Sequence, residues 1–154
     1  MSDFHIEHGH EDYDAEDLLE QAQANAQALL AATAGFLAER GLLADWAAAL
    51  GARFGQGWGE PRPWDAAEFL DAMLTNYRAL GAEVLVHRLG VDRAEATIGP
   101  FPDPDVLAMF GLAPGVADAF HDAPAAIAGP RGLEWRWVRD GEDVHFLVER
   151  AGEG

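Results

Sequence analysis

Histidines and nearby carboxylates are the side chains of this sequence that could perform acid–base chemistry. The expected pairing of two strands places His87, which has apolar neighbours, opposite Glu95. A carboxylate can hold a half-buried imidazole as a general base, although a contact on a solvent-facing sheet gives the same pattern. His121 precedes Asp122 at a predicted helix end, where the helix dipole alone favours a cation. The candidate catalytic residues of a hydrolase-like enzyme are therefore His87, Glu95 and His121.

Recognisable catalytic and cofactor-binding motifs are missing. The sequence contains no cysteine, which excludes disulfides, thiol nucleophiles and thiolate metal ligands. It has no HExxH, GxSxG, dinucleotide-binding or EF-hand pattern. The glycines of residues 55–59 do not follow a strand, and no lysine accompanies them, so they do not form a phosphate-binding loop. Arg136 and His145, which the expected register pairs with each other on the polar face of the second hairpin, are further polar candidates. We expect no cofactor.

Aromatic side chains define a second kind of candidate site. The loop predicted for residues 55–64 contains three glycines and two prolines, and it carries two tryptophans. Such a loop usually covers a core, but it can also close over an apolar ligand. The predicted wall of a ligand pocket consists of Trp58, Trp64, Tyr77, Phe110 and Phe120, with Trp135 and Trp137 as additional candidates.

The N-terminal residues combine histidines with carboxylates. His5, His8 and His10 could bind Zn²⁺ or Ni²⁺, for which imidazole and carboxylate are suitable ligands. Their spacing matches no metal motif, and a flexible acidic tail explains the same composition. We therefore expect residues 1–13 to be a flexible tail without an assigned metal, and residues 14–150 to form a single globular domain.

The charge of the chain limits its partners. The 154 residues carry a formal net charge of −17, and all ten basic residues are arginines. This surface repels nucleic acid and anionic lipid, but it could attract cations or a basic partner protein. A small hydrophobic molecule is an expected partner on the separate ground of the aromatic side chains. The same composition is typical of an acidic soluble protein or of a GC-rich genome. No signal peptide and no apolar run of roughly 20 residues is present, which favours a cytoplasmic protein.

Helical periodicity predicts three helices in the N-terminal half. The first spans about residues 15–40 after the N-cap Asp14, the second about residues 43–54, and the third follows the capping pair Asp65 and Glu68. The Ala, Gln and Asn face of the first helix could pack against another helix, including one from a second subunit. Its predicted apolar stripe consists of Leu18, Ala22, Ala26, Leu29, Leu30, Thr33, Phe36 and Leu37.

Alternating polarity predicts two β-hairpins, residues 83–98 and 133–149, on either side of a helical segment at residues 104–128. The first hairpin should pair Val86 with Ala96. Asp140-Gly141 is the expected turn of the second hairpin and pairs Trp135 with Phe146. The fold class is therefore α+β, with N-terminal helices packed on a four-stranded antiparallel sheet. The expected buried face of the second hairpin comprises Leu133, Trp135, Trp137, Val144, Phe146 and Val148.

This order of elements resembles the small-ligand-binding domain of the four-vinyl reductase family, which is related in fold to Bet-three-like subunits of vesicle-tethering complexes. It is also similar to bacterial proteins described as amino-thiazoline carboxylic acid hydrolases. The resemblance covers less than half of the chain and implies an apolar pocket between helices and sheet. Such relatives usually carry cysteines in the central segment and last hairpin, so their metal, thiol or hydrolase chemistry does not extend to this cysteine-free chain. The matching stretches are Leu80-Gly81-Ala82-Glu83-Val84, residues 101–120, and Arg139-Asp140-Gly141-Glu142-Asp143-Val144-His145-Phe146.

The leading functional prediction is a bacterial-type sensory or binding domain for a small apolar ligand. A hydrolase-like enzyme that uses a histidine with a nearby carboxylate is the first alternative. The second is a homodimeric protein–protein interaction module joined through the Ala and Gln face of the first helix.

Overall fold

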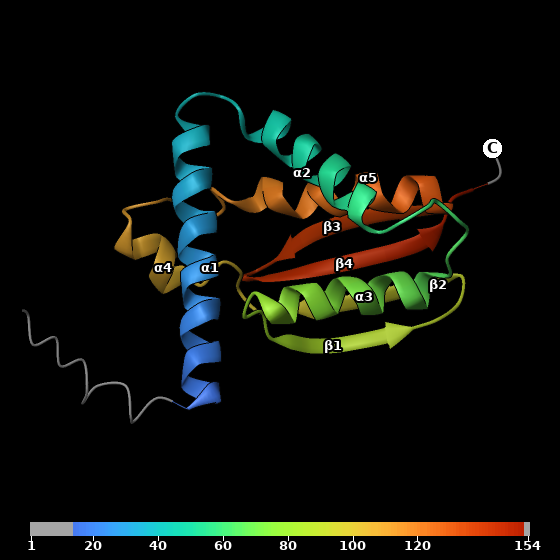
Figure 1. Cartoon of the computed structure of the whole chain (residues 1–154), viewed down its shortest axis with the longest axis horizontal. Coiled ribbons are helices and arrows are strands. Elements are labelled where there is room, and N and C mark those ends of the chain that lie inside the picture. Colours follow the sequence, from blue (N-terminus) through green and yellow to red (C-terminus); the bar gives the residue numbers. More distant parts are fainter. Residues whose placement is uncertain (1–13, 153–154) are drawn as a thin grey trace, which may run out of the picture.

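Four antiparallel strands in the order β1-β2-β4-β3 form the sheet of this protein, and helices cover one of its faces (Figure 1). The computed structural model describes residues 14–152, and the predicted α+β class is confirmed. The histidine-containing tail lies outside the described residues. The elements are α1 (Ala15–Ala38), α2 (Leu43–Gly57), α3 (Ala66–Ala79), β1 (Val84–Leu89), β2 (Arg93–Ile98), α4 (Pro104–Met109), the 3₁₀ helix η1 (Asp118–Asp122), α5 (Ala123–Ala128), the 3₁₀ helix η2 (Gly129–Arg131), β3 (Leu133–Asp140) and β4 (Asp143–Arg150).

The hairpin of β3 and β4 has the predicted buried face but not the predicted pairing. Asp140 pairs with Asp143, so the two turn residues are Gly141 and Glu142 rather than Asp140 and Gly141. Gly141 has a φ of 63°, which a glycine adopts without strain. The pairing of Trp135 with Phe146 was therefore wrong, and Trp135 pairs with Val148. Because the shift is two residues and side chains alternate, the same side chains still face the core.

The hairpin of β1 and β2 differs from the prediction by a single residue. Gly90 N–H donates to the Arg93 carbonyl at 3.0 Å, which leaves a two-residue turn where a three-residue turn was expected. His87 consequently pairs with Ala96, and Glu95 pairs with Arg88. Directly paired residues share a face and neighbouring residues alternate, so His87 and Glu95 belong to opposite faces of the sheet. The expected cross-strand contact between them was wrong.

Helix α3 is the main cover of the sheet. Its N-cap Asp65 accepts from the Glu68 N–H at 2.7 Å, and the Glu68 carboxylate accepts from the Asp65 N–H at 3.0 Å, which confirms the predicted capping box. The helix packs on β1, β2 and β4, and its apolar stripe forms the centre of the core. Its buried residues are Ala66, Phe69, Leu70, Met73, Leu74 and Tyr77.

Helix α1 is rotated about its axis relative to the sequence-based expectation, so a different face is buried. Figure 1 shows it crossing one end of the sheet, with its N-terminal end projecting beyond β1. Gln27 is only 8% exposed, whereas Leu29 of the predicted buried stripe is 70% exposed. The Gln27 amide donates to the Leu80 carbonyl at 2.9 Å and accepts from the Asp103 N–H at 2.7 Å. Only part of the predicted apolar stripe faces inward, because Leu30 packs against the core whereas Leu18 and Phe36 are exposed. The buried residues of α1 are Gln27, Ala31, Ala34 and Gly35.

Helix α2 packs on α5 through a very close main-chain approach. A Cβ atom added at Gly51 would lie 2.5 Å from the Ala123 carbonyl oxygen and 2.8 Å from the Ala126 Cβ. Only a glycine leaves room for this crossing. The chain leaves α2 at Trp58, and the Trp64 N–H then donates to the Arg131 carbonyl at 3.2 Å, which ties the following loop to η2.

Candidate functional site

A half-open apolar cavity of about 490 Å³ lies between α2, α3 and the segment formed by η1 and α5. The spacing of Met73 and Tyr77 by one helical turn directs both side chains to the same side of α3. The cavity has few polar groups, chiefly the Arg53 guanidinium and the Asn76 amide. It is lined by Arg53, Phe54, Gly57, Trp58, Met73, Asn76, Tyr77, Ala79, Leu80, Phe120, Ala123, Pro124 and Ile127.

Aromatic packing fixes the wall of this cavity. The Trp58 ring lies 5.4 Å from the Trp64 ring and 5.4 Å from the Phe69 ring, measured between centroids. On the other side, the rings of Tyr77 and Phe120 meet edge-on at 5.9 Å. Such contacts between buried rings add to the energy of area burial and hold each ring in one orientation. The wall is therefore preformed by side chains that the core itself holds in place.

Tyr77 connects the cavity to a fully buried histidine. The Tyr77 hydroxyl lies 2.7 Å from His121 Nδ1, and the two rings are stacked. His121 is 0% exposed and surrounded by the rings of Phe101, Trp137 and Phe146. Its Nε2 atom makes no hydrogen bond with the described residues. His121 thus stands behind the cavity wall, while Tyr77 and Phe120 form the wall itself.

Burial keeps both members of this pair uncharged. Loss of solvation is the largest influence on His121 and lowers its pKa to about 4, against the opposing effect of the Asp118 carboxylate. Burial likewise raises the pKa of the Tyr77 hydroxyl far above its usual range, and the Asp122 carboxylate adds to this shift. At neutral pH the pair is consequently a hydrogen-bonded phenol and neutral imidazole.

These shifts make the pair a poor catalytic couple. A general base works best when its pKa lies near the working pH, and the pKa of His121 has moved away from that range. A tyrosine with a raised pKa is equally slow to give up its proton. The hydrogen bond instead satisfies two polar groups inside an aromatic core, which stabilises the fold and fixes the Tyr77 ring.

The structure brings together part of the predicted pocket wall. Trp58, Tyr77 and Phe120 line the cavity, whereas Trp64 supports Trp58 from behind and Phe110 is exposed at the end of α4. Trp135 and Trp137 do not line the cavity either. Their indole N–H groups donate to the His121 carbonyl at 2.7 Å and to the Asp122 carboxylate at 2.6 Å, and so hold η1 against β3.

Sequence reasoning missed the pairing of Tyr77 with His121, which are 44 residues apart. The available signal was the apolar setting of His121, since Ala117, four residues before it, and Ala123, two residues after it, are buried as well. Arg53, Met73 and Ile127 are further lining residues that were not predicted to line a site. They come from three helices, and no local pattern links them.

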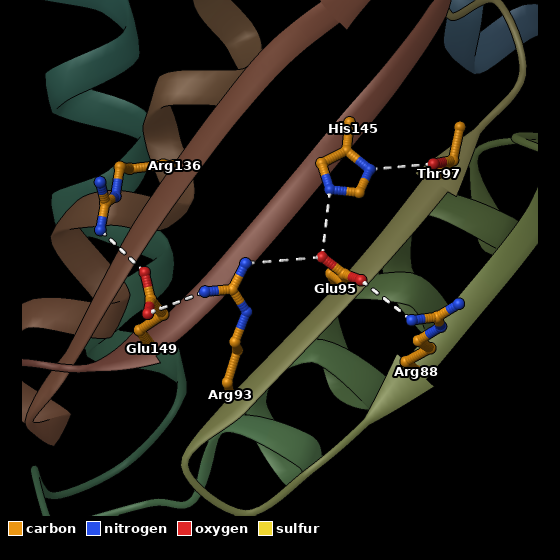
Figure 2. A network of polar contacts seen from close by, with 7 residues as sticks. All are labelled: Arg88, Arg93, Glu95, Thr97, Arg136, His145 and Glu149. Atoms are coloured by element: carbon orange, nitrogen blue, oxygen red, sulfur yellow. Dashed lines mark hydrogen bonds and ion pairs between the residues drawn. The ribbon is translucent and has the colours of Figure 1, made fainter.

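A second group of polar side chains lies on the uncovered face of the sheet (Figure 2). Glu95 is its centre, because its carboxylate lies 3.8 Å from Arg93, 4.0 Å from Arg88 and 3.6 Å from His145 Nε2. The Thr97 hydroxyl lies 3.0 Å from His145 Nδ1. The whole network, drawn in Figure 2, comprises Arg88, Arg93, Glu95, Thr97, Arg136, His145 and Glu149.

Thr97, His145 and Glu95 form a hydroxyl–imidazole–carboxylate chain like that of nucleophilic hydrolases. The setting does not support that chemistry. The three residues lie on β2 and β4, the strands that pair on both sides, so backbone N–H groups are engaged in the ladder rather than aimed at an oxyanion. None of these three residues lines the apolar cavity or a second cavity beside α4. The network is therefore a set of ion pairs and hydrogen bonds between three arginines, two glutamates, a histidine and a threonine on the uncovered face.

Comparison with known proteins gives no match: no family model, curated protein or solved structure is significantly similar to this chain. The resemblance to ligand-binding and hydrolase families therefore remains a prediction. Among residues 14–152, no group of three or more His, Asp or Glu side chains is placed to hold a metal ion. His5, His8 and His10 lie outside this range. In the same part of the chain, no helix is both long and apolar enough to cross a membrane.

Proposed function

We propose that this protein binds a small, mainly apolar molecule in the cavity between α2, α3 and α5. The observation that carries the proposal is the cavity itself, which is apolar, half-open and lined by Trp58, Tyr77 and Phe120. Its volume of about 490 Å³ falls within the range of roughly 300–1,000 Å³ that is typical of small-molecule sites. Arg53 and Asn76 would meet a polar or anionic end of the ligand.

Binding without catalysis is the function that the chemistry favours. The polar pair nearest the cavity, Tyr77 and His121, is neutral, and its internal hydrogen bond already occupies the Tyr77 hydroxyl and His121 Nδ1. His87 belongs to the exposed edge strand β1 and lies on the opposite face of the sheet from Glu95. A hydrolase mechanism through His121 would lack a base with a suitable pKa. One through His87 and Glu95 would lack a pocket for its substrate, because neither residue lines the cavity.

The cavity can be blocked from its exposed rim to test this function. Ala79 lines the cavity and is exposed, so Ala79→Trp should fill the space without disturbing the core. The probe is the neutral dye N-phenyl-1-naphthylamine, whose fluorescence rises in an apolar site. We expect the wild type to bind the dye and Ala79→Trp to bind it about tenfold more weakly or worse.

The matched control is Thr75→Trp, which adds a tryptophan to an exposed position of the same helix that does not line the cavity. This variant should bind the dye as the wild type does. Absence of dye binding by the wild type, or equal binding by Ala79→Trp, would contradict the proposed function.

A further inference from the structure

The outward face of α1 is an apolar stripe that no element of the described chain covers. Leu18, Leu29 and Phe36 are 66%, 70% and 56% exposed. Ala22, Asn25 and Ala32 are exposed between them. Successive members are four and three residues apart, which is the spacing of a seam between two packed helices. The stripe, defined as Leu18, Ala22, Asn25, Leu29, Ala32 and Phe36, runs nearly the length of α1.

The stripe is held outward by the polar contacts on the other side of α1. Gln23 donates to the Arg78 carbonyl at 2.9 Å, and Gln27 forms its two hydrogen bonds to Leu80 and Asp103. Rotation of the stripe into the core would break these bonds and leave the buried Gln27 amide without partners, which is costly. The exposed side chains are thus a stable feature of the helix orientation.

The charge distribution identifies what fits this face. No charged residue occurs from Gln21 to Ala38, although the whole chain has a formal net charge of −17. Two copies of such an acidic chain repel each other over most of their surface. The stripe provides an area where they can approach without placing like charges together, and its alanines allow close helix packing at about 8 Å.

The stripe is also matched to itself in reverse. If two α1 helices lie antiparallel with their midpoints at Gln27, Leu18 faces Phe36 of the second copy and Ala22 faces Ala32. Asn25 then faces Leu29 at the centre of the stripe. The same arrangement brings the acidic N-terminal turn, with Asp14 and Asp17, to Arg40 of the second copy. A two-fold interface requires this kind of self-complementarity, in which each patch meets the other's counterpart.

We propose that the protein forms a homodimer through antiparallel packing of the α1 stripes. The interface places the two ligand cavities outside the contact, because the lining residues come from α2, α3, η1 and α5 and none belongs to α1. Dimer formation and ligand binding are therefore separate properties, and loss of one leaves the other measurable.

The first test is sedimentation velocity of the full chain at low micromolar concentration. The wild type should be a dimer, and Leu29→Glu, which puts a charge into the centre of the stripe, should raise the dimer dissociation constant about tenfold or more. The matched control is Val138→Glu on the uncovered sheet face, since Val138 is 57% exposed and the charge change is the same. This variant should remain dimeric.

A monomeric wild type would overturn the proposal. The stripe would then be covered by residues 1–13 or by a different partner. A dimer that is insensitive to Leu29→Glu would also overturn it, because the contact would then lie elsewhere. If both Leu29→Glu and Val138→Glu were monomeric, the added charge would weaken the dimer regardless of its position. That result would equally contradict the proposal.

The second test uses the absence of cysteine to read the direction of packing. A mixture of Ala22→Cys and Ala32→Cys chains should form a disulfide-linked heterodimer on mild oxidation, because positions 22 and 32 face each other. Each variant alone should not cross-link, since its two cysteines would be about 15 Å apart along the helix axis. Efficient cross-linking of Ala22→Cys alone would indicate parallel packing and reject the antiparallel arrangement.

Discussion

Helices α3 and α1 begin in the same way and are used in opposite ways. Each starts with an aspartate-based capping box, Asp65 with Glu68 and Asp14 with Asp17, and each carries an apolar stripe at helical spacing. The stripe of α3 is the centre of the core, whereas that of α1 points outward and the glutamine side is buried. Periodicity therefore determines which residues share a face, and the neighbouring elements decide whether that face is inside.

The difference between the two helices should be largest when a stripe residue is truncated. Phe69→Ala in α3 removes a ring that is 0% exposed and should lower the free energy of unfolding by about 3–5 kcal/mol. Leu29→Ala in α1 should change it by about 0.5 kcal/mol or less. Denaturant unfolding of dilute protein measures both, under conditions where a second copy adds little stability. A large loss in Leu29→Ala would show that the stripe is buried within one chain.

The polar anchors of the two helices differ in their response to pH. Tyr77 of α3 is bonded to His121, whose pKa of about 4 lies below the ordinary value of about 6.5. The unfolded chain therefore takes up this proton first as the pH falls. The contribution of uncharged His121 to the free energy of unfolding is complete above about pH 6.5. It declines toward pH 4 by on the order of 3 kcal/mol. Gln27 of α1 does not titrate.

The measurement is the free energy of unfolding between pH 7 and pH 4.5 for the wild type and His121→Gln. Other carboxylates titrate in this range too, so the informative quantity is the difference between the two slopes. The variant should show a flatter decline. Equal slopes would contradict the low pKa of His121 in the folded protein.

Removal of the Gln27 amide, which anchors α1, should lower the free energy of unfolding by less than removal of a core ring but by more than removal of a surface amide. Gln27→Ala leaves the Leu80 carbonyl and Asp103 N–H without their partner and should cost about 1–3 kcal/mol. Gln21→Ala serves as control, because Gln21 is exposed and bonds only to Asn25 among the hydrogen-bond partners in the described part of the chain. Equal stabilities of the two variants would show that α1 is not held by Gln27.

The N-caps of α3 and α1 should give the smallest difference in stability between the two helices. Asp65→Ala should destabilise the protein by about 1 kcal/mol, because the first turn of α3 already contributes Phe69 and Leu70 to the core. Asp14→Ala should cost about 0.5 kcal/mol or less, since the first turns of α1 are exposed and can fray without opening the core. Thermal unfolding of the two variants checks the order, which would be reversed if α1 were the more tightly packed helix.

Features determined by residues close in sequence were predictable. The Asp65 and Glu68 capping box, the N-cap Asp14 and the alternation of β3 and β4 depend on neighbours within a few positions. The pairing of both hairpins was missed because the choice of turn residues sets the register, and Gly90-Val91-Asp92 and Asp140-Gly141-Glu142 each allow more than one choice. A change of one residue was enough to separate His87 from Glu95.

The site was predictable only in part for a related reason. Aromatic density pointed to Trp58, Tyr77 and Phe120, which do line the cavity. The contact between Tyr77 and His121 joins two segments that are distant in sequence, as do the bonds from Gln27 to Leu80 and Asp103. Such contacts arise from the packing of whole elements, so a local sequence pattern does not predict them.

The glycine at the crossing of α2 and α5 has a consequence for the kinetics of ligand entry. At Gly51 the main chain of α2 meets the Ala123 carbonyl and the Ala126 methyl group directly, and neither group has a rotamer change that can absorb a sliding motion. These two walls of the cavity should therefore move as one body. Entry then depends on exposed rim side chains such as Phe54, which reorient within picoseconds to nanoseconds. A ligand would be admitted by fast side-chain gating, and its residence time would be set by the fit inside.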